Sequence, residues 1–180
     1  MRPIRWLAAL SIAAIASSMA AAQEPPKPGP EHEFLKKLTG KWECTVQFGN
    51  QESKGMMTYR PILDGLWMES SFKGEFNGSK FEGKGLNGYN PMKKKYVSVW
   101  IDSMAPAPLV LEGTYDADKK TLTMEGEGVG MDGKPTKQKE VTTWQDDDTY
   151  LMKFYQGGDS NAMMTITYKR VNRISWQELP

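Results

Sequence analysis

The chain has 180 residues, 25% of them charged, and a formal net charge of +1 at neutral pH. A charge this close to zero argues against binding to a phosphate backbone, which needs a basic stripe, so nucleic acid is not an expected partner. Cys44 is the single cysteine, so no disulfide can form within the chain, and we expect an inert, buried thiol at this position.

The first 22 residues have the pattern of a secretory signal peptide. Arg2 and Arg5 give a basic start, residues 6–16 are almost entirely apolar, and three alanines ending at Ala22 suit a cleavage site. The apolar stretch is far shorter than the roughly 20 residues that a membrane-spanning helix needs. We therefore predict a signal peptide over 1–22, a periplasmic or secreted protein, and no membrane span.

A proline-rich leader over 23–31 precedes the folded domain, because prolines at this density favour an extended chain. A short helix is expected next, since Phe34, Leu35 and Leu38 fall on one helical face and Gly40 can end it. A helix of this length is not stable alone, so it must pack against the domain. We predict one domain over 32–172 and a C-terminal tail over 173–180.

The rest of the chain alternates between apolar and polar residues. This period of two is typical of strands that have one solvent-exposed face and one buried face. Turn residues separate the runs, and no helix long enough for a parallel crossover lies between them. The pattern predicts an all-β fold, a roughly ten-stranded antiparallel up-and-down barrel with the short helix at one end. The expected strands are 42–48, 54–62, 66–76, 79–89, 95–102, 108–115, 120–129, 136–144, 149–156 and 162–170.

Glycines recur on the faces that we expect to point inward. The run 83–88 matches the letters of a dinucleotide-binding motif, but it lies inside an expected strand, with no helix to face a pyrophosphate. We interpret these glycines as positions where the sheet bends or the interior stays partly empty. The positions concerned are Gly83, Gly85, Gly113, Gly126 and Gly128.

The candidate ligand-binding residues are those that alternation places toward the interior. Trp100 and Asp102 share one face of their strand, opposite Val97, Val99 and Ile101, and alternation alone does not decide which face is inward. If Trp100 and Asp102 are inward, they form a polar handle in an apolar pocket. The full candidate set is Phe72, Phe81, Tyr89, Trp100, Asp102, Glu112, Tyr115, Met124 and Phe154, of which Phe72, Phe81, Tyr115, Met124 and Phe154 should converge on one cavity.

No catalytic or metal-binding motif stands out. His32 is the single histidine, it lies at the edge of the leader, and no nucleophile-elbow serine accompanies it. One histidine and one cysteine are too few for a zinc site. Haem ligation by His32 and copper binding by the scattered methionines remain alternatives. We expect neither a cofactor nor a metal, and interpret His32 as a helix-start residue.

Two resemblances support the barrel. Gly40-Lys41-Trp42, together with Arg170 on the last expected strand, resembles the signature of lipocalin-like (calycin) barrels, in which the tryptophan closes one end beneath a basic side chain. Ordered motifs along the chain resemble domain-of-unknown-function family 1579, whose members are mostly bacterial and often exported. The motifs are Pro30-Glu31-His32, Gly40-Lys41-Trp42, Gly85-Leu86-Asn87-Gly88-Tyr89-Asn90, Tyr96-Val97-Ser98-Val99-Trp100-Ile101-Asp102-Ser103 and Glu112-Gly113-Thr114-Tyr115-Asp116.

The family resemblance implies a lipocalin-like fold and export but no activity, so no catalytic residue can be assigned. Asn90 stands where the family pattern leads us to expect an aspartate, which argues against a metal at that turn. We expect an extracytoplasmic barrel that binds a small, largely apolar ligand. One alternative is an enzyme that uses Asp102 or Glu112 as acid or base; another is a structural or interaction module with a filled core. The oligomeric state stays open.

Overall fold

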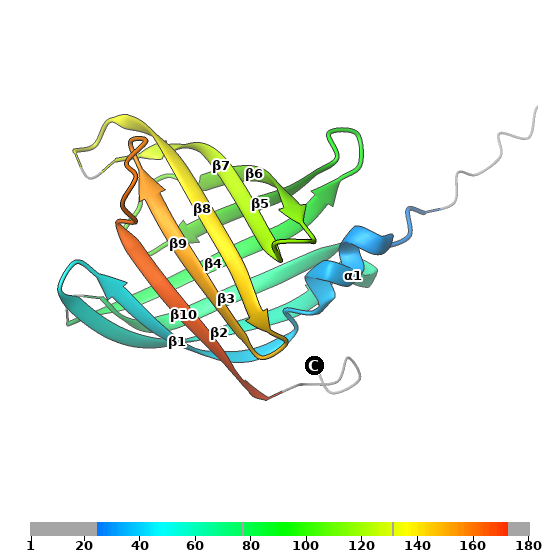
Figure 1. Ribbon diagram of the computed structural model, residues 1–180, viewed down its shortest axis with the longest axis horizontal. Helices are drawn as coiled ribbons and strands as arrows, with labels where there is room; N and C mark the ends of the chain where they lie inside the picture. Colours follow the sequence, from blue (N-terminus) through cyan, green and yellow to red (C-terminus); the bar gives the residue numbers. More distant parts are fainter. Residues whose placement is uncertain (1–24, 77, 131, 173–180) are drawn as a thin grey trace, which may run out of the picture.

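The structure is a computed structural model that describes residues 25–76, 78–130 and 132–172. The predicted signal peptide and the predicted C-terminal tail lie outside these residues. The helix α1 (Pro30–Lys36) is followed by strands that close into a single barrel, and α1 lies at one end of it (Figure 1). No helix in the described ranges has the length and apolar character needed to cross a bilayer.

Every strand pairs antiparallel with its neighbours in sequence, and the first pairs with the last to close the barrel. The predicted fold class and the predicted order of strands are confirmed. The strands are β1 (Gly40–Phe48), β2 (Gln51–Ile62), β3 (Trp67–Phe76), β4 (Ser79–Asn90), β5 (Lys95–Asp102), β6 (Leu109–Asp116), β7 (Thr121–Val129), β8 (Pro135–Asp146), β9 (Thr149–Gln156) and β10 (Met164–Asn172), with a 3-10 turn, η1 (Leu63–Gly65), between β2 and β3.

The largest difference from the predicted boundaries is at the start of β2, which begins at Gln51 rather than at residue 54. Gly49 has a φ of +57°, in the left-handed region, and this lets the chain reverse at once between β1 and β2. The β1–β2 hairpin is therefore paired up to its turn, with Phe48 opposite Gln51.

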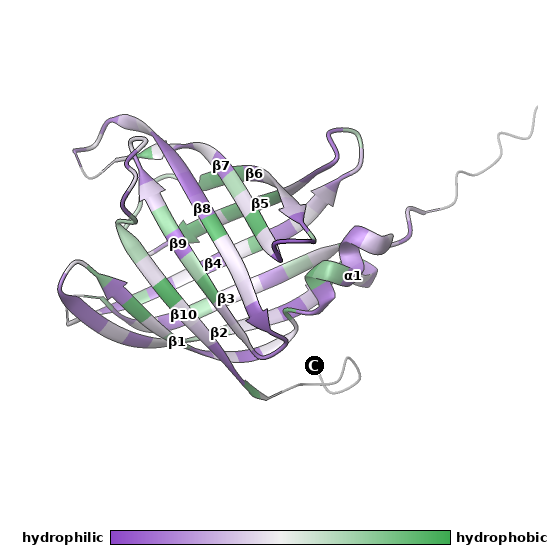
Figure 2. Cartoon of the chain, viewed as in Figure 1, coloured by the Kyte–Doolittle hydropathy of each residue, from purple (hydrophilic) through white to green (hydrophobic). Residues whose placement is uncertain are grey.

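The register decides which side chains point inward. One inward row runs from Ser70 on β3 through Gly85 on β4 and Trp100 on β5 to Leu109 on β6. Trp100 and Asp102 therefore belong to the inner face of β5, and the alternate residues, from Val97 to Ile101, belong to its outer face. Figure 2 shows the corresponding alternation of hydrophilic and hydrophobic residues along most strands.

We call the end of the barrel that carries α1 the helix end and the opposite end the far end. At the helix end, Phe34 of α1 packs against Tyr96, Tyr115 and Trp144, with ring centroids 5.3, 4.1 and 5.0 Å away. The short helix is thus held by aromatic contacts from three different strands, as its length requires.

Trp42 closes the helix end from inside. Its side chain has 0% exposure, and its Nε1–H donates to the Leu38 carbonyl at 2.7 Å. The Arg170 guanidinium lies 3.9 Å from the centroid of the indole ring. This is the arrangement that the calycin resemblance implies, in which a basic side chain of the last strand covers the tryptophan.

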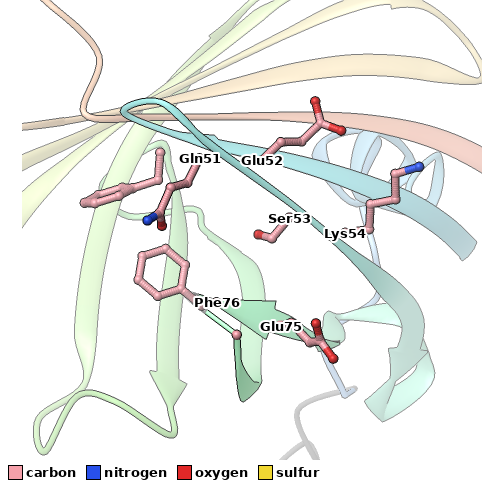
Figure 3. A pocket seen from close by; sticks show the side chains of 8 residues that line it. Gln51, Glu52, Ser53, Lys54, Glu75 and Phe76 are labelled. Atoms are coloured by element: carbon pink, nitrogen blue, oxygen red, sulfur yellow. The ribbon is translucent and has the colours of Figure 1, made fainter.

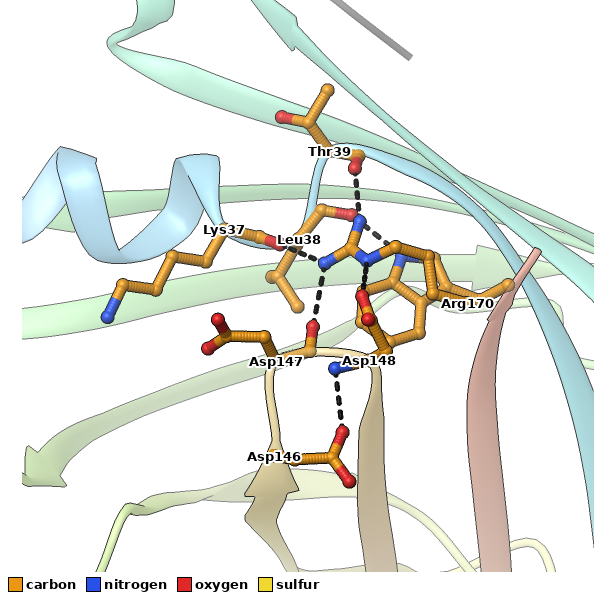
Figure 4. Close-up of polar contacts among 8 residues, drawn as sticks. Lys37, Leu38, Thr39, Asp146, Asp147, Asp148 and Arg170 are labelled. Atoms are coloured by element: carbon orange, nitrogen blue, oxygen red, sulfur yellow. Dashed lines mark hydrogen bonds and ion pairs between the residues drawn. The ribbon is translucent and has the colours of Figure 1, made fainter. Parts of the chain in front are cut away.

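Arg170 also ties the segment after α1 to the barrel wall. Its guanidinium donates to the carbonyls of Thr39 and Lys37, both at 2.6 Å, and to the Asp147 carbonyl at 3.1 Å (Figure 4). Its Nε–H donates to the Asp148 carboxylate at 2.8 Å. Charge-assisted hydrogen bonds from Arg170 of β10 therefore fix the helix end, because they reach both the α1–β1 connection and the β8–β9 turn.

Candidate functional site

The interior is solid near the helix end. Tyr150 stacks on Tyr168 with ring centroids 4.2 Å apart, and the Tyr150 hydroxyl donates to the Tyr59 hydroxyl at 3.1 Å. Cys44 is 1% exposed, and burial raises the pKa of its thiol to about 12, which keeps it neutral. The expected burial of Cys44 is confirmed, and these residues belong to one packed cluster at the helix end.

The far half of the interior differs, because many of its inward side chains keep some solvent exposure. Phe81 and Trp100 on one wall and Phe154 on the other are partly exposed although the register turns them inward. Further partly exposed inward residues are Leu109, Glu140, Met152 and Met164. An inward aromatic side chain that water can still reach indicates accessible space in this half of the barrel.

A hollow of about 590 Å³ lies at the far end, between the β1–β2 and β3–β4 hairpins. It exists because β2 and β3 pair only from Gly55 and Gly74 onward, so the hairpins separate beyond these glycines. In Figure 3, Ser53 and Phe76 point into the hollow, whereas Glu52 points away from it. A second hollow of about 530 Å³ lies at the same end, lined by residues that include Thr136, Gln156 and Met163.

A chain of aromatic rings connects the first hollow to the interior. Phe48 and Phe76, which line it, have ring centroids 5.2 Å apart. Phe76 lies 6.3 Å from Phe81, and Phe81 lies 5.7 Å from the buried Phe72. These edge-on and tilted contacts make a continuous apolar wall from the mouth of the barrel inward.

The glycines do not leave empty space, contrary to the expectation from sequence. A Cβ built on Gly83 would stand 2.1 Å from the Trp100 ring, so the indole occupies the space that the glycine provides. A Cβ on Gly126 would stand 2.2 Å from the Val110 carbonyl oxygen, and one on Gly113 only 1.8 Å from a carbonyl oxygen. These glycines allow close approach of side chains and strands, and the accessible space comes instead from the separated hairpins.

The structure divides the predicted site residues into groups. One group faces the interior in the half of the barrel toward the far end: Phe72, Phe81, Trp100 and Phe154. Tyr89, Tyr115 and Met124 also face inward, but they belong to the cluster that packs with Phe34 and Leu35 of α1. The five residues expected to converge on one cavity do not form one group. Phe72 and Phe81 belong to one packed cluster, Met124 and Tyr115 belong to the cluster around Phe34, and Phe154 belongs to neither.

Asp102 faces inward, yet its carboxylate is already engaged. The Trp100 Nε1–H donates to one oxygen at 3.0 Å, and the backbone N–H groups of Met104 and Ala105 donate to the other at 2.8 and 2.9 Å. Asp102 therefore holds the Trp100 indole in place and caps the turn that follows β5.

Glu112 lies on the outer face of β6, opposite Val97 of β5. It accepts a hydrogen bond from Lys93 Nζ at 2.6 Å, and this contact holds the pKa of the carboxyl below its usual range. A side chain on the outer face cannot line the interior, so Glu112 is not available as an interior acid or base. Gly113 is the inward residue of this part of β6, so its neighbour Glu112 must point outward.

His32 serves the start of α1. The Gly29 N–H donates to its Nδ1 at 3.0 Å, and the ring meets Tyr89 edge-on with centroids 6.3 Å apart. The helix-start interpretation is confirmed. Within the described ranges, no group of three or more His, Cys, Asp and Glu side chains is placed to hold a metal ion.

Glu140 is an interior titratable residue that does not appear among the candidates from sequence. The register places it on the inner face of β8, between Met124 of β7 and Phe154 of β9. The Thr142 hydroxyl donates to its carboxyl at 3.1 Å, and burial raises the pKa of the carboxyl. Residues 137–140 are polar on both faces of β8, so hydropathy does not show which face is inward. Counting in steps of two from the inward Trp144 is the signal that could have placed Glu140 inside.

A family of proteins and a solved structure are similar to this chain. Among solved structures, the chain is similar to one described as a redesigned beta barrel, with 16% sequence identity and a TM-score of 0.40; the match covers 76% of this chain and 93% of that one. None of the curated proteins compared with the chain matches it. The family described as protein of unknown function (DUF1579) matches residues 27–170, and the chain belongs to this family.

Proposed function

We propose that the protein is an extracytoplasmic binding protein whose barrel takes up a small, largely apolar ligand through the far end. The observation that carries the proposal is the partial exposure of inward Phe81, Trp100 and Phe154, in a barrel whose opposite end is tightly packed. Apolar lining with a few polar groups is typical of small-molecule sites. The hollow between the separated hairpins gives such a ligand a way in.

A substitution that fills the hollow tests the proposal. Ser53 lines the hollow, so Ser53→Trp should block uptake of a fluorescent apolar probe. Thr167→Trp, on the outer face of β10 opposite Thr45, adds the same side chain away from the hollow and should bind the probe as the wild type does. Equal binding by both variants, or no binding by the wild type, would contradict the proposal and favour a solid structural module.

The extracytoplasmic location rests on the predicted signal peptide. Protein isolated from the exported fraction should begin at Gln23 by intact-mass measurement. Native mass spectrometry of the same sample should show a retained small molecule and give its mass. A mature chain that keeps the residues before Ala22 would contradict the proposed location while leaving the proposed binding site intact.

A second candidate function is acid–base catalysis in the same interior. The observation that favours it is the inward Glu140 carboxyl, whose pKa burial raises above its usual range. An enzyme of this kind would process its ligand rather than release it unchanged. Incubating the retained ligand with wild type and with Glu140→Gln separates the two functions, because turnover by the wild type alone would favour the enzyme.

A further inference from the structure

Glu140 is a carboxyl in an apolar row of side chains. Its direct neighbours across the strands are Met124 and Phe154, and its hydrogen bond is with Thr142. Direct cross-strand neighbours on one face have Cβ atoms about 5 Å apart, so apolar groups flank the carboxyl on both sides. A carboxylate in such surroundings loses solvation without gaining a full set of partners, and this is costly.

No basic side chain of the described strands compensates Glu140. The register places three charged side chains on the inner face of these strands, namely Asp102, Glu140 and Arg170. Arg170 is bound at the helix end over Trp42, and Asp102 is bound to Trp100 and the following turn. The part of the interior that water can reach therefore carries acidic groups and no basic one.

The lysines nearest to Glu140 in sequence point away from it. Lys137 and Lys139 alternate with Glu140 along β8 and lie on the outer face, where Lys139 pairs with Glu125 at 3.7 Å. Lys153, which precedes Phe154 on β9, is also on the outer face. Reaching Glu140 would require these side chains to cross the sheet, so a partner for the carboxyl must come from the interior.

An apolar row leads from Glu140 to the mouth of the barrel. Successive strand pairs place Glu140 opposite Phe154, Phe154 opposite Met164, and Met164 opposite Phe48. Phe48 lines the hollow at the far end. At about 4.8 Å per strand, the row is about 14 Å long, which suits an apolar body that extends from the hollow to the carboxyl.

We propose that Glu140 is the anchor of the ligand site, and that the ligand is a small molecule with an apolar body and a basic nitrogen. This inference rests on the proposed binding function. The nitrogen donates to the Glu140 carboxylate, and the body lies along Phe154, Met164 and Phe48. Aromatic faces near the carboxylate also attract a cation, and a charge-assisted hydrogen bond is stronger than a neutral one. A ligand carboxylate would be repelled from the same position.

The experiment compares three probes that share a ten-carbon backbone and differ in the polar group: decylamine, decanol and decanoate. Their affinities are measured by displacement of the fluorescent apolar probe from wild type, Glu140→Gln and Glu125→Gln. Wild type should bind decylamine most tightly and decanoate most weakly. Glu140→Gln should lower the affinity for decylamine about ten- to a hundredfold and leave that for decanol unchanged, the range expected for loss of a charge-assisted hydrogen bond.

Glu125→Gln is the matched control, because it removes a carboxyl from the outer face of β7, where the side chain pairs with Lys139. Its affinities should equal those of wild type. If Glu140→Gln does not fold, wild type still gives an answer, since the carboxyl ¹³C resonance of Glu140 should shift on addition of decylamine and stay in place with decanol.

The outcomes separate this inference from the proposed function. Binding of decanol as tight as that of decylamine in wild type, or an unchanged decylamine affinity in Glu140→Gln, would overturn the anchor and leave the binding function standing. Tightest binding of decanoate would do the same. Failure of all three probes and of the fluorescent probe to bind wild type would overturn both.

Discussion

The two ends of the barrel are made from the same strands and the same alternation, yet they differ in packing. At the helix end, Trp42, Tyr150 and Tyr168 are almost completely buried, and the Arg170 guanidinium covers the Trp42 ring. At the far end, inward Phe81 and Trp100 remain partly exposed. Alternation determines which side chains point inward, but whether they fill the interior depends on what covers the end.

The difference has a structural origin at each end. α1 brings Phe34 and Leu35 onto the helix end and adds apolar volume there. At the far end no corresponding element covers the described barrel, and β2 separates from β3 beyond Gly55 and Gly74. The helix end therefore supplies stability, and the far end supplies accessible space. Substitutions and pH changes at either end test this division.

The largest effect is expected for Trp42→Ala. Removing a fully buried aromatic side chain typically costs 3–5 kcal/mol of unfolding free energy, because a cavity remains. Here the loss also includes the hydrogen bond to Leu38 and the contact with Arg170. Urea denaturation should show a much larger loss for Trp42→Ala than for Trp100→Ala, whose side chain is partly exposed. Equal losses would contradict the division between a packed end and an accessible end.

A smaller loss is expected where a glycine permits two strands to approach. Gly126→Ala would place a methyl group 2.2 Å from the backbone carbonyl of Val110, so β6 and β7 must shift, at a cost of about 1–3 kcal/mol. Gly128→Ala is the control, because its methyl group would meet the flexible side chain of Gln138. Thermal unfolding should rank Gly126→Ala clearly below Gly128→Ala; the reverse order would show that Gly126 faces open space.

The third effect concerns alkaline pH and the helix end. The thiol of Cys44 has a pKa of about 12 in the folded protein against 9.0 as its ordinary value. Between these values the unfolded thiol loses its proton while the folded one keeps it, so stability is complete below pH 9 and falls as pH rises. The slope from this group is about 1.4 kcal/mol per pH unit.

Urea denaturation between pH 8 and pH 11 checks this slope, with Cys44→Ala as the comparison. The variant should be less stable at pH 8, and its stability should fall less steeply with pH than that of wild type. Buried Tyr150 and Tyr168, whose pKa values burial also raises, should leave some slope in the variant. Identical slopes would show that the thiol ionises in the folded protein and that the helix end is more open than its packing indicates.

The sequence alone determined the barrel, the order of its strands and the closure of one end. These features follow from local signals: alternation of side chains, turn residues, and the short motif at Gly40-Lys41-Trp42, whose tryptophan is indeed fully buried. Local signals suffice because a strand and its turn are specified by residues close together in the chain. The burial of Cys44 followed from the same alternation with Trp42.

Only the tertiary structure decided what the interior contains. The register between β4 and β5 turned Trp100 and Asp102 inward, and the register of β8 did the same for Glu140, whose neighbouring residues are polar on both faces. The contact between Gly83 and the Trp100 ring likewise joins two strands, so no single segment could reveal that the glycine is covered. Inner and outer faces, and filled and open space, depend on pairing between strands, which residues within one strand do not specify.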